Sequence, residues 1–180
     1  MIETPRLILR SFSADDVPAM VAGLGNFAVA RNTGRVPYPY GPADAEAFLQ
    51  RLADNESPSL NLAIALKSMP EKLVGGIGLT ADNARTADLG YWLMETLWNR
   101  GLGLEAARAI TDHAFGKLGF STLTASYHAG NDASHRILLR LGFVPVSDGL
   151  AYSLARDQEV PVEYMELARA RWRQHKAAGL

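Results

Sequence analysis

The sequence predicts a single α/β domain, with a mixed and mostly antiparallel sheet of about seven strands flanked by about four helices. Three observations lead to this prediction. The chain has 180 residues, which suits one domain, and 48% of them are apolar, which suffices for a core. Segments that alternate apolar and polar residues are interleaved with segments of helical periodicity. We place the domain at residues 1–172 and a C-terminal tail at 173–180.

The first half of the chain supplies most of the predicted strands. Its elements, in order, are a strand at 2–10, a helix at 13–24, a loop at 31–41, a helix at 42–53, and strands at 60–66, 73–80 and 88–93. Ser13 and Asp16 have the spacing of a capping box, although Pro18 falls inside that helix. Pro42 suits the first position of the second helix. The link at 67–72 predicts a hairpin connection between the strands at 60–66 and 73–80.

The second half alternates helices and strands. Its elements are a helix at 102–118, a strand at 122–128, a helix at 133–141, a strand starting at 143–146, a loop at 147–159 and a final strand at 162–168. Gly119 and Gly142 stand where glycine commonly ends a helix.

Composition excludes several classes of function. Lys and Arg number 18 and Asp and Glu 19, so a net charge of −1 provides no field for holding a nucleic-acid backbone. Cysteine is absent and no two histidines have metal-ligand spacing, so neither thiol catalysis nor a bound metal is expected. The start of the chain lacks the pattern of a secretory signal, and no stretch approaches the roughly 18 apolar residues of a membrane span. We expect a soluble, cytoplasmic protein without membrane or nucleic-acid partners.

The segment Arg100-Gly101-Leu102-Gly103 joins a predicted strand to a predicted helix. Helix N-termini carry unpaired N–H groups and a partial positive charge, and glycine lets a ligand approach the backbone. The segment therefore predicts a site for phosphate or pyrophosphate, with a tight turn as the alternative. Leu104 and its neighbours do not continue it into a dinucleotide fingerprint or a Walker loop.

A second polar segment, Asn131-Asp132-Ala133-Ser134, lies between the strand at 122–128 and the following helix. One interpretation is helix capping by Asn131 or Asp132. The other interpretation places Asn131 and Ser134 toward a ligand at the end of the strand.

Trp98 to Ala106 resembles the coenzyme A pyrophosphate loop of the GCN5-related N-acetyltransferase (GNAT) superfamily. More narrowly, the chain is similar to the RimJ/RimL subgroup, which acetylates the N-termini of ribosomal proteins. The likeness extends over nearly the whole chain. Further segments that resemble motifs of the subgroup are Thr4–Arg10, Pro37–Tyr40, Leu73–Ile77, Asp88–Leu93, Asn131–Ser134, Leu141–Phe143, Glu163–Leu167 and Trp172.

The resemblance implies acetyl-CoA as cofactor, bound where the strands containing 91–93 and 124–128 splay apart. It implies cofactor contacts from Tyr91, Trp92, Leu93, Arg100, Gly101, Leu102, Gly103, Leu104 and Asn131. It also implies that Ser134 protonates the leaving thiolate. Many members use a tyrosine as that acid, and no tyrosine stands near position 134 in the sequence. Trp98 stands where the superfamily often has Gln or Arg.

Asp88, Glu95 and His128 are the candidates for a general base. The resemblance places Asp88 on a strand that often carries a carboxylate acting through water, and a solvent-facing charge is the alternative. His128 has an ordinary pKa near 6.5, which suits a base, and a partly exposed histidine is the alternative. An α-amine with a pKa near 8 is already about one-tenth neutral at pH 7, whereas deprotonating a lysine costs about 4.6 kcal/mol. A weak base therefore suffices for an α-amine.

Two further groups are candidates for binding. Arg136 and Arg140 are one helical turn apart and suit the 3′-phosphate of coenzyme A, or else form an exposed basic face. Tyr38, Tyr40 and Tyr152 fall in predicted loops and are candidates for the walls of the acceptor site, with packing as the alternative.

The leading hypothesis is transfer of an acetyl group from acetyl-CoA to a primary amine, which attacks the thioester directly. The favoured acceptor is a protein N-terminal α-amine. One alternative is a small-molecule amine such as a polyamine, amino sugar or antibiotic. Another, of a different class, is a non-catalytic domain that binds acyl-CoA as a sensor. The fold alone does not choose the acceptor. Sequence leaves the oligomeric state open between a monomer and a homodimer.

Overall fold

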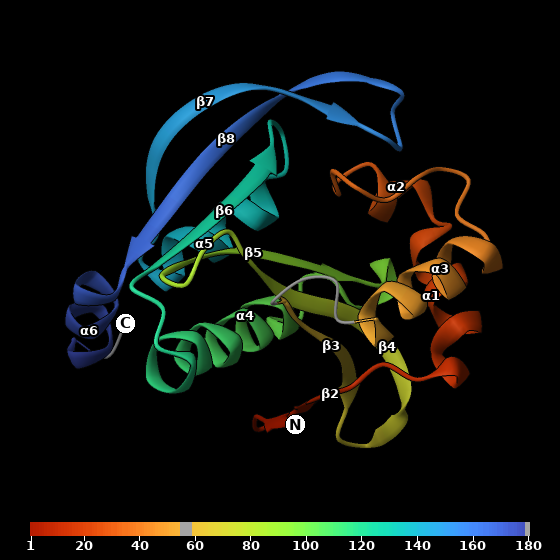
Figure 1. Cartoon of the computed structure of the whole chain (residues 1–180), viewed down its shortest axis with the longest axis horizontal. Coiled ribbons are helices and arrows are strands. Elements are labelled where there is room, and N and C mark those ends of the chain that lie inside the picture. The colour runs from red at the N-terminus through yellow and green to blue at the C-terminus, as the bar shows by residue number, and fades with distance from the viewer. Residues whose placement is uncertain (55–58, 179–180) are drawn as a thin grey trace.

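The computed structural model describes residues 1–54 and 59–178. Within these residues the chain forms an eight-stranded sheet in the order β1-β2-β3-β4-β5-β6-β8-β7 (Figure 1). The strands are β1 (Ile2–Glu3), β2 (Leu7–Arg10), β3 (Ser59–Leu66), β4 (Met69–Ala81), β5 (Thr86–Leu93), β6 (Thr122–His128), β7 (Val144–Ser153) and β8 (Gln158–Ala168). β5 and β6 run parallel, and the other neighbouring pairs are antiparallel. The mixed, mostly antiparallel sheet predicted from the sequence is confirmed.

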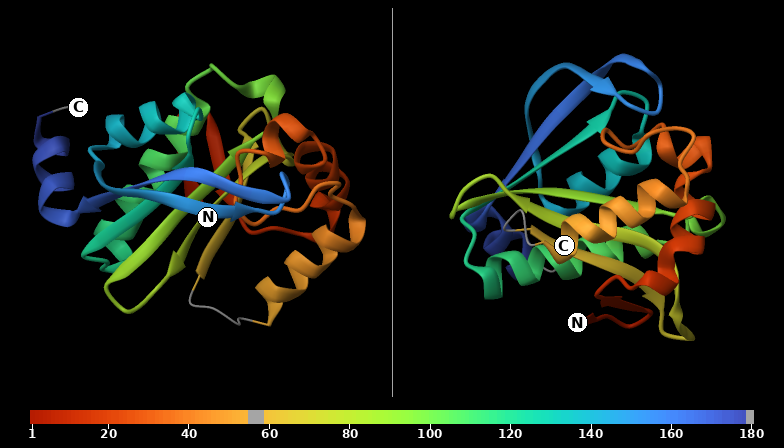
Figure 2. Two further views of the ribbon diagram at one scale, coloured as in Figure 1. Left: turned by 90° about the horizontal axis from the view of Figure 1, so that it is seen from above. Right: turned by 45° about the vertical axis from the view of Figure 1, so that its right-hand side comes forward.

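Helices cover both faces of the sheet and create two cores. The helices are α1 (Val17–Leu24), α2 (Phe27–Ala30), α3 (Pro42–Ala53), α4 (Leu102–His113), α5 (Asp132–Leu141) and α6 (Arg169–Ala177). The larger core joins the sheet to α4 and α5 and includes Leu89, Ile110 and Leu138. The smaller core lies on the other side, under α1 and α3, and includes Met20 and Ala45. Figure 2 shows α1 to α3 grouped on one side of the sheet and α4 on the other.

Local signals placed several elements correctly. The helix at 42–53 begins at Pro42 as predicted, and the strand at 122–128 has the predicted bounds. The strand predicted at 2–10 is divided, because Thr4 N–H donates to the Leu7 carbonyl (3.0 Å) and turns the chain between β1 and β2. The connection predicted at 67–72 is shorter, since Leu66 already pairs with Met69.

The loop predicted at 147–159 is wrong in most of its length. β7 extends through Ser153 and β8 begins at Gln158, so the two strands form one long hairpin. Every residue from 145 to 150 is exposed, because β7 is the edge strand of the sheet. Such a strand lacks the alternation that predicts strands from sequence. Helix α6 continues across position 172, the predicted end of the domain.

β5 and β6 separate after a short paired segment. Their register joins Thr86 to Thr122 and ends with Asp88 beside Thr124, although both strands continue for four or five more residues. Beyond Asp88 the described chain has no register pair between them. The predicted splayed strand pair is therefore present, and its opening lies between 90–93 and 126–128.

The β7–β8 hairpin arches over this opening and reaches the loop after α2 (Figures 1 and 2). At its tip, Leu154 N–H donates to the Gly34 carbonyl at 3.4 Å, and Arg156 Nε donates to the Arg31 carbonyl at 3.1 Å. His128 Nδ1, at the end of β6, lies 3.0 Å from the same Arg31 oxygen. We call this hairpin, residues 144–168, the arch. It gives the opening a roof that is hydrogen-bonded at its far end.

A buried ion pair fixes the start of α1 to β2. Arg10 donates to both carboxylate oxygens of Asp16 at 2.7 and 2.8 Å, and Asp16 is 2% exposed. Burial alone would raise the pKa of Asp16, but hydrogen bonds from Arg10 and Ser13 outweigh it and the pKa is lowered.

We expect Asp16→Ala to lower the free energy of unfolding by about 3 kcal/mol at pH 7, because it leaves the Arg10 charge without its partner. The folded pKa lies below the unfolded value near 3.9, so this contribution is complete above that value and is lost as pH falls through the folded pKa. Urea unfolding at pH 7 and in acid measures both effects. The neighbouring exposed Asp15 is the control, and an equal loss in Asp15→Ala would contradict the assignment.

Candidate active site

The glycine segment opens helix α4 as the sequence predicted. Gly101 is the N-cap and has φ of 75°, a left-handed conformation that favours glycine. The first turn of the helix is closed by Glu105 N–H, which donates to the Gly101 carbonyl at 3.1 Å. The N–H groups of Leu102, Gly103 and Leu104 precede that bond and have no partner within the helix. Unpaired N–H groups at the positive end of a helix dipole are suited to binding an anion.

Neighbouring side chains hold this loop against the sheet and α5. A Cβ on Gly103 would lie 3.1 Å from Ile137 Cδ1 and 3.5 Å from Leu93 Cδ1, so the backbone approaches α5 closely. Trp98 Nε1 donates to the Leu93 carbonyl at 2.9 Å. Trp98 therefore ties the loop to the end of β5, which gives a structural role to an aromatic side chain at this position.

The edge of β5 that faces the opening carries backbone groups from alternate residues. Met94 N–H donates to the Val74 carbonyl of β4 at 2.9 Å, so Met94 faces β4. Successive residues of a strand point their backbone groups to opposite edges. Tyr91 and Leu93 consequently face the opening, and Trp92 faces β4. That Trp92 also serves the cofactor stays a prediction; its backbone groups face β4 and its side chain packs against the smaller core.

On the α4–α5 side of the opening, two hydroxyl groups form a pair. Tyr91 Oη lies 2.9 Å from Ser134 Oγ, although the two residues are 43 positions apart. No local pattern in the sequence places a tyrosine beside Ser134, because only the fold brings β5 and α5 together. Burial raises the pKa of Tyr91 to about 12, so its phenol keeps its proton at neutral pH. Asn131 Oδ1 accepts from Ser134 N–H at 3.2 Å, so Asn131 caps α5 while its amide nitrogen stays available for a ligand.

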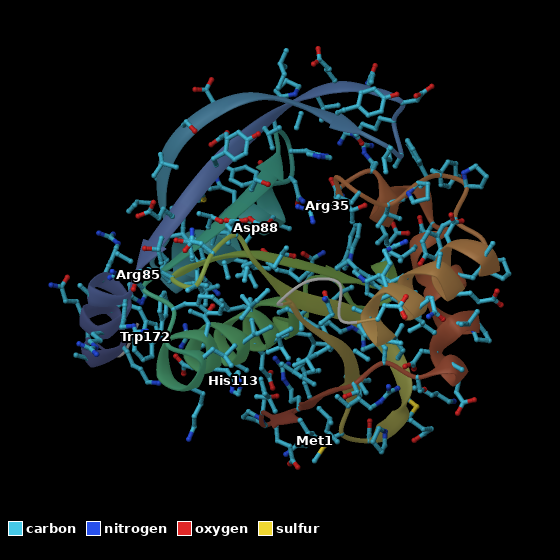
Figure 3. The ribbon with its side chains drawn as sticks, viewed as in Figure 1. Met1, Arg35, Arg85, Asp88, His113 and Trp172 are labelled. Atoms are coloured by element: carbon cyan, nitrogen blue, oxygen red, sulfur yellow. The ribbon has the colours of Figure 1, made fainter. Side chains whose placement is uncertain are left out.

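The opposite face carries the two candidate bases of the sheet. Side chains alternate along β5, so Asp88 points away from Tyr91, to the face beneath the arch (Figure 3). Burial raises the pKa of Asp88, although a hydrogen bond from Thr124 Oγ1 (3.3 Å) and the charge of Arg35 oppose the shift. Arg35, from the loop after α2, has no sequence signal that links it to Asp88.

His128 is 4% exposed, so it is not the partly exposed histidine that was the alternative to a base. Burial lowers its pKa and the nearby Arg156 lowers it further, against the bond to the Arg31 carbonyl. A carbonyl oxygen can only accept a hydrogen bond. Nδ1 of His128 must therefore carry the ring proton, and Nε2 is left as an acceptor. The third candidate base, Glu95, is exposed and accepts from Asn26 Nδ2 at 2.6 Å.

The three tyrosines proposed for the acceptor site have different positions. Tyr40 is 8% exposed and belongs to the smaller core, so it has the packed position that was the alternative to a place in the acceptor wall. Tyr38 is exposed and its ring lies 5.0 Å from that of Phe27. Tyr152 is exposed near the tip of the arch, where its hydroxyl donates to Asp157.

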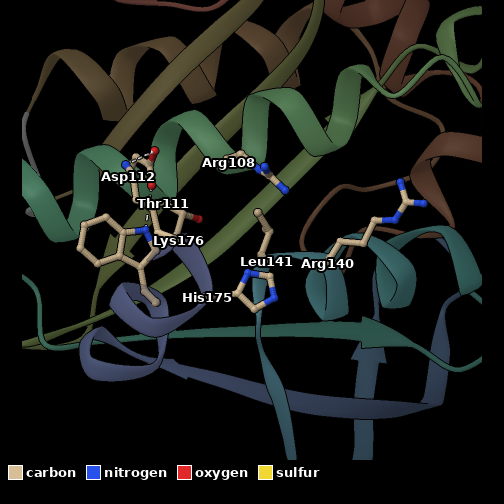
Figure 4. Close-up of a pocket in the computed structure, with 8 residues that line it drawn as sticks. Arg108, Thr111, Asp112, Arg140, Leu141, His175 and Lys176 are labelled. Carbon is tan, nitrogen blue, oxygen red and sulfur yellow. Dashed lines mark hydrogen bonds and ion pairs between the residues drawn. The ribbon is translucent and has the colours of Figure 1, made fainter. Parts of the chain in front are cut away.

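Arg136 and Arg140 are both exposed on α5. Arg140 lines a pocket of about 180 Å³ between α4, α5 and α6, together with Arg108, His175 and Lys176 (Figure 4). The charge of Lys176 is paired there with Asp112 at 2.8 Å. Arg136 is not among the residues that line this pocket.

The described part of the chain has neither a cluster of metal ligands nor a membrane-spanning helix. No three His, Asp or Glu side chains within 1–54 and 59–178 gather closely enough to hold a metal ion. Among the helices in those ranges, none is both long and apolar enough to cross a membrane.

A glycine-opened helix N-terminus beside a splayed parallel strand pair defines an α/β protein that binds a phosphate-bearing cofactor in the opening. Comparison with known sequences identifies the family. The sequence model described as the acetyltransferase (GNAT) domain matches residues 6–144, and the chain therefore belongs to the GNAT family. It is an acetyl-CoA-dependent N-acetyltransferase.

Three known proteins illustrate the likeness. An otherwise uncharacterized N-acetyltransferase, YoaA of Bacillus subtilis strain 168, is 31% identical over 147 residues, which cover 79% of this chain and 82% of YoaA. The spermidine N-acetyltransferase of Vibrio cholerae, solved with CoA and spermine, superposes with a TM-score of 0.80 at 14% identity, covering 94% of this chain and 99% of its own. The ribosomal-protein-S5-alanine acetyltransferase of Vibrio fischeri superposes with a TM-score of 0.77 at 16% identity, covering 94% and 97%. The family and the fold predicted from the sequence are confirmed.

Removing either hydroxyl of the Tyr91–Ser134 pair is expected to lower kcat three- to tenfold, the worth of one hydrogen bond to a developing thiolate. Affinity for coenzyme A should change less, because the backbone contacts remain. Steady-state kinetics and calorimetry on Tyr91→Phe and Ser134→Ala measure both quantities. Tyr40→Phe, which removes a buried phenol hydroxyl in the smaller core, is the control. Unchanged kcat in both variants would show that neither hydroxyl stabilises the departing thiolate.

Proposed function

We propose that this GNAT protein acetylates a protein N-terminal α-amine. The observation that carries the proposal is the division of the opening. Backbone amides and paired hydroxyls lie toward α4 and α5, whereas Asp88 and His128 lie beneath the arch. A cofactor that enters from the helix side and an amine that enters beneath the arch would meet in the gap between β5 and β6.

The residues present fit acetyl-CoA. The N–H groups of Leu102, Gly103 and Leu104 would hold its pyrophosphate, and Gly101 lets the phosphates approach. Acetyl-CoA, when bound, supplies the activated acyl thioester. The N–H of Tyr91 or Leu93 faces the gap and would polarise the thioester carbonyl, a contribution of about 3 kcal/mol by analogy with other oxyanion donors. Arg136 or Arg140 would hold the 3′-phosphate.

The proton chemistry favours an α-amine. Burial raises the pKa of Asp88 and lowers the pKa of His128, so burial strengthens the carboxylate as a base and weakens the imidazole. An α-amine with a pKa near 8 needs only about 1.4 kcal/mol for deprotonation at pH 7. The first proton, lost when the ammonium form becomes the neutral amine, passes through the base to solvent. The second, lost from nitrogen as the amide forms, equals the proton that the departing thiolate takes up, so transfer from the neutral amine balances without another acid.

Ser134 and Tyr91 would donate hydrogen bonds to the sulfur as the thioester breaks. A phenol with a pKa of about 12 is a much weaker acid than a thiol of pKa about 8.5, so these hydroxyls stabilise the thiolate without giving up their protons.

A small-molecule amine is the second candidate, and the arch favours it. Bonds from Leu154 and Arg156 to the loop after α2 cover the acceptor side and narrow its access to a chain end or a small molecule. The carboxyl group of Asp88, beneath the arch, suits an amine acceptor. The spermidine acetyltransferase of Vibrio cholerae shares this fold.

Thiol release with acetyl-CoA across an acceptor panel tests the proposal. The panel contains peptides with Ser, Ala, Thr or Met at the N-terminus, the same peptides with a blocked α-amine, polyamines, aminoglycosides and single amino acids. Turnover with free-amine peptides alone would support the proposal. Turnover confined to a small amine would replace it, and binding of acetyl-CoA without turnover would favour the sensor alternative.

A further inference from the structure

Glu105, in the first turn of α4, is bound to the start of the chain. Its Oε1 accepts from Thr4 Oγ1 at 2.6 Å and from Arg6 N–H at 2.8 Å, and its Oε2 accepts from Arg6 Nε at 2.7 Å. The side chain of Glu105 is only 14% exposed, whereas that of Arg6 is 51% exposed. Both oxygens of a largely buried carboxylate are thus committed to a segment about 100 residues away in the sequence.

Arg6 also reaches the backbone of the phosphate loop. Its Nη1 donates to the carbonyl oxygen of Arg100 at 2.9 Å. In a planar trans peptide the C=O and the following N–H point in opposite directions. The bond to the Arg100 carbonyl therefore aims the Gly101 N–H away from Arg6.

Two side chains, Glu105 and Arg6, consequently act on the peptide plane between Arg100 and Gly101. Glu105 holds the guanidinium of Arg6 by a charge-assisted bond, and Arg6 holds the Arg100 carbonyl. Gly101 sits against this arrangement, since a Cβ added to it would lie 3.4 Å from Arg6 Nη2. We call Arg6 and Glu105 together the clamp. Without the clamp, the peptide between Arg100 and Gly101 is free to rotate in an exposed loop.

We propose that Arg6 and Glu105 are positioning residues for the pyrophosphate loop, and that they preorganise the Gly101 N–H for the phosphates of acetyl-CoA. The proposal rests on the cofactor assignment above. Preorganisation removes the cost of ordering the loop on binding, so its loss weakens affinity while the reacting groups stay in place.

The test measures the dissociation constant for CoA by calorimetry, together with kcat and KM for acetyl-CoA, in Arg6→Gln and Glu105→Gln. We expect each variant to raise Kd and KM at least tenfold and to change kcat less than twofold. Arg10→Gln is the matched control, because Arg10 forms a similar clamp with Asp16 and the Pro70 carbonyl far from this loop. It should lower the melting temperature without changing Kd.

Arg6→Lys separates position from charge. Lysine keeps the positive charge near the phosphates but has no planar fork to bind Glu105 and the Arg100 carbonyl together. We expect Arg6→Lys to bind CoA as weakly as Arg6→Gln. Normal affinity in Arg6→Lys would show that charge alone matters and would overturn the proposal.

Two other results would also decide the matter. Equal weakening by Arg10→Gln would assign the effect to general destabilisation and overturn the proposal. If the native protein binds CoA and the Arg6 and Glu105 variants bind it equally well, positioning is wrong while the cofactor assignment stands. Failure of the native protein to bind CoA would instead overturn the cofactor assignment.

Discussion

Replacing Gly101 with valine is expected to weaken acetyl-CoA binding by at least tenfold, approaching a hundredfold. Gly101 has φ of 75°, and a β-branched residue is strongly disfavoured in this conformation. Valine would force the backbone at the N-cap of α4 to change, and the N–H groups of the first turn would lose their common direction. Each tenfold loss corresponds to about 1.4 kcal/mol, so the strain and one misplaced hydrogen bond suffice. Calorimetric titration with CoA gives the value directly.

Gly119→Val is the control for backbone strain. Gly119 follows the other end of the same helical segment, has φ of 83° and would have no atom within 4 Å of an added Cβ. Its replacement should lower the melting temperature about as much as Gly101→Val, and it should leave CoA affinity intact. Unchanged affinity in Gly101→Val would falsify the assignment of residues 100–104 as the phosphate loop.

Replacing Asp88 with asparagine is expected to slow acetylation by an amount that depends on the acceptor. If Asp88 removes the amine proton, its loss costs up to about tenfold at pH 7 for an α-amine, and up to about a thousandfold for an alkyl amine of pKa near 10.4. The defect with an α-amine should shrink toward pH 9, where that amine is already neutral. Measuring kcat/KM from pH 5 to pH 9.5 with both acceptors reveals the pattern.

The acid side of the same profile tests the pKa of Asp88. The pKa is raised by burial, and the base is active only as the carboxylate, so the rate should fall as pH drops through this raised value. The hydrogen bond from Thr124 lowers the pKa, so Thr124→Val should shift the fall to higher pH. His128→Gln is tested in the same way. If kcat/KM falls in His128→Gln with this dependence on pH and acceptor, and does not fall in Asp88→Asn, the base is His128.

Much of the fold is readable from local sequence because its elements carry their own start and stop signals. Pro42 begins α3, and Gly119 and Gly142 end their helices in left-handed conformations. β7 carries no such signal, because an edge strand with exposed residues on both faces has no apolar alternation. The prediction of a loop there failed for this physical reason.

Only those features of the site that depend on sequence neighbours could likewise be predicted from the sequence. The glycine loop and the Asn131 cap depend on neighbours in the sequence, and both were visible before the structure. The Tyr91–Ser134 pair and the Arg6–Glu105 clamp join residues 43 and 99 positions apart, and nothing local announces them. Tyr40 lies in a Pro- and Tyr-rich loop, a composition typical of exposed segments. Its ring nevertheless enters the smaller core, through contacts with residues that are distant in the sequence.

The bonds at the tip of the arch use only main-chain oxygens of the loop after α2. The carbonyls of Gly34 and Arg31 accept the two bonds from the tip, made by Leu154 and Arg156, and the Arg31 carbonyl also accepts from His128 at the end of β6. Every residue type carries that carbonyl, so the side chains of this loop are free to change during evolution without opening the roof. A protein built this way can acquire new acceptors by drift in one short segment while its cofactor half stays constant. Exchanging residues 32–36 between relatives is the corresponding route for redirecting its specificity in the laboratory.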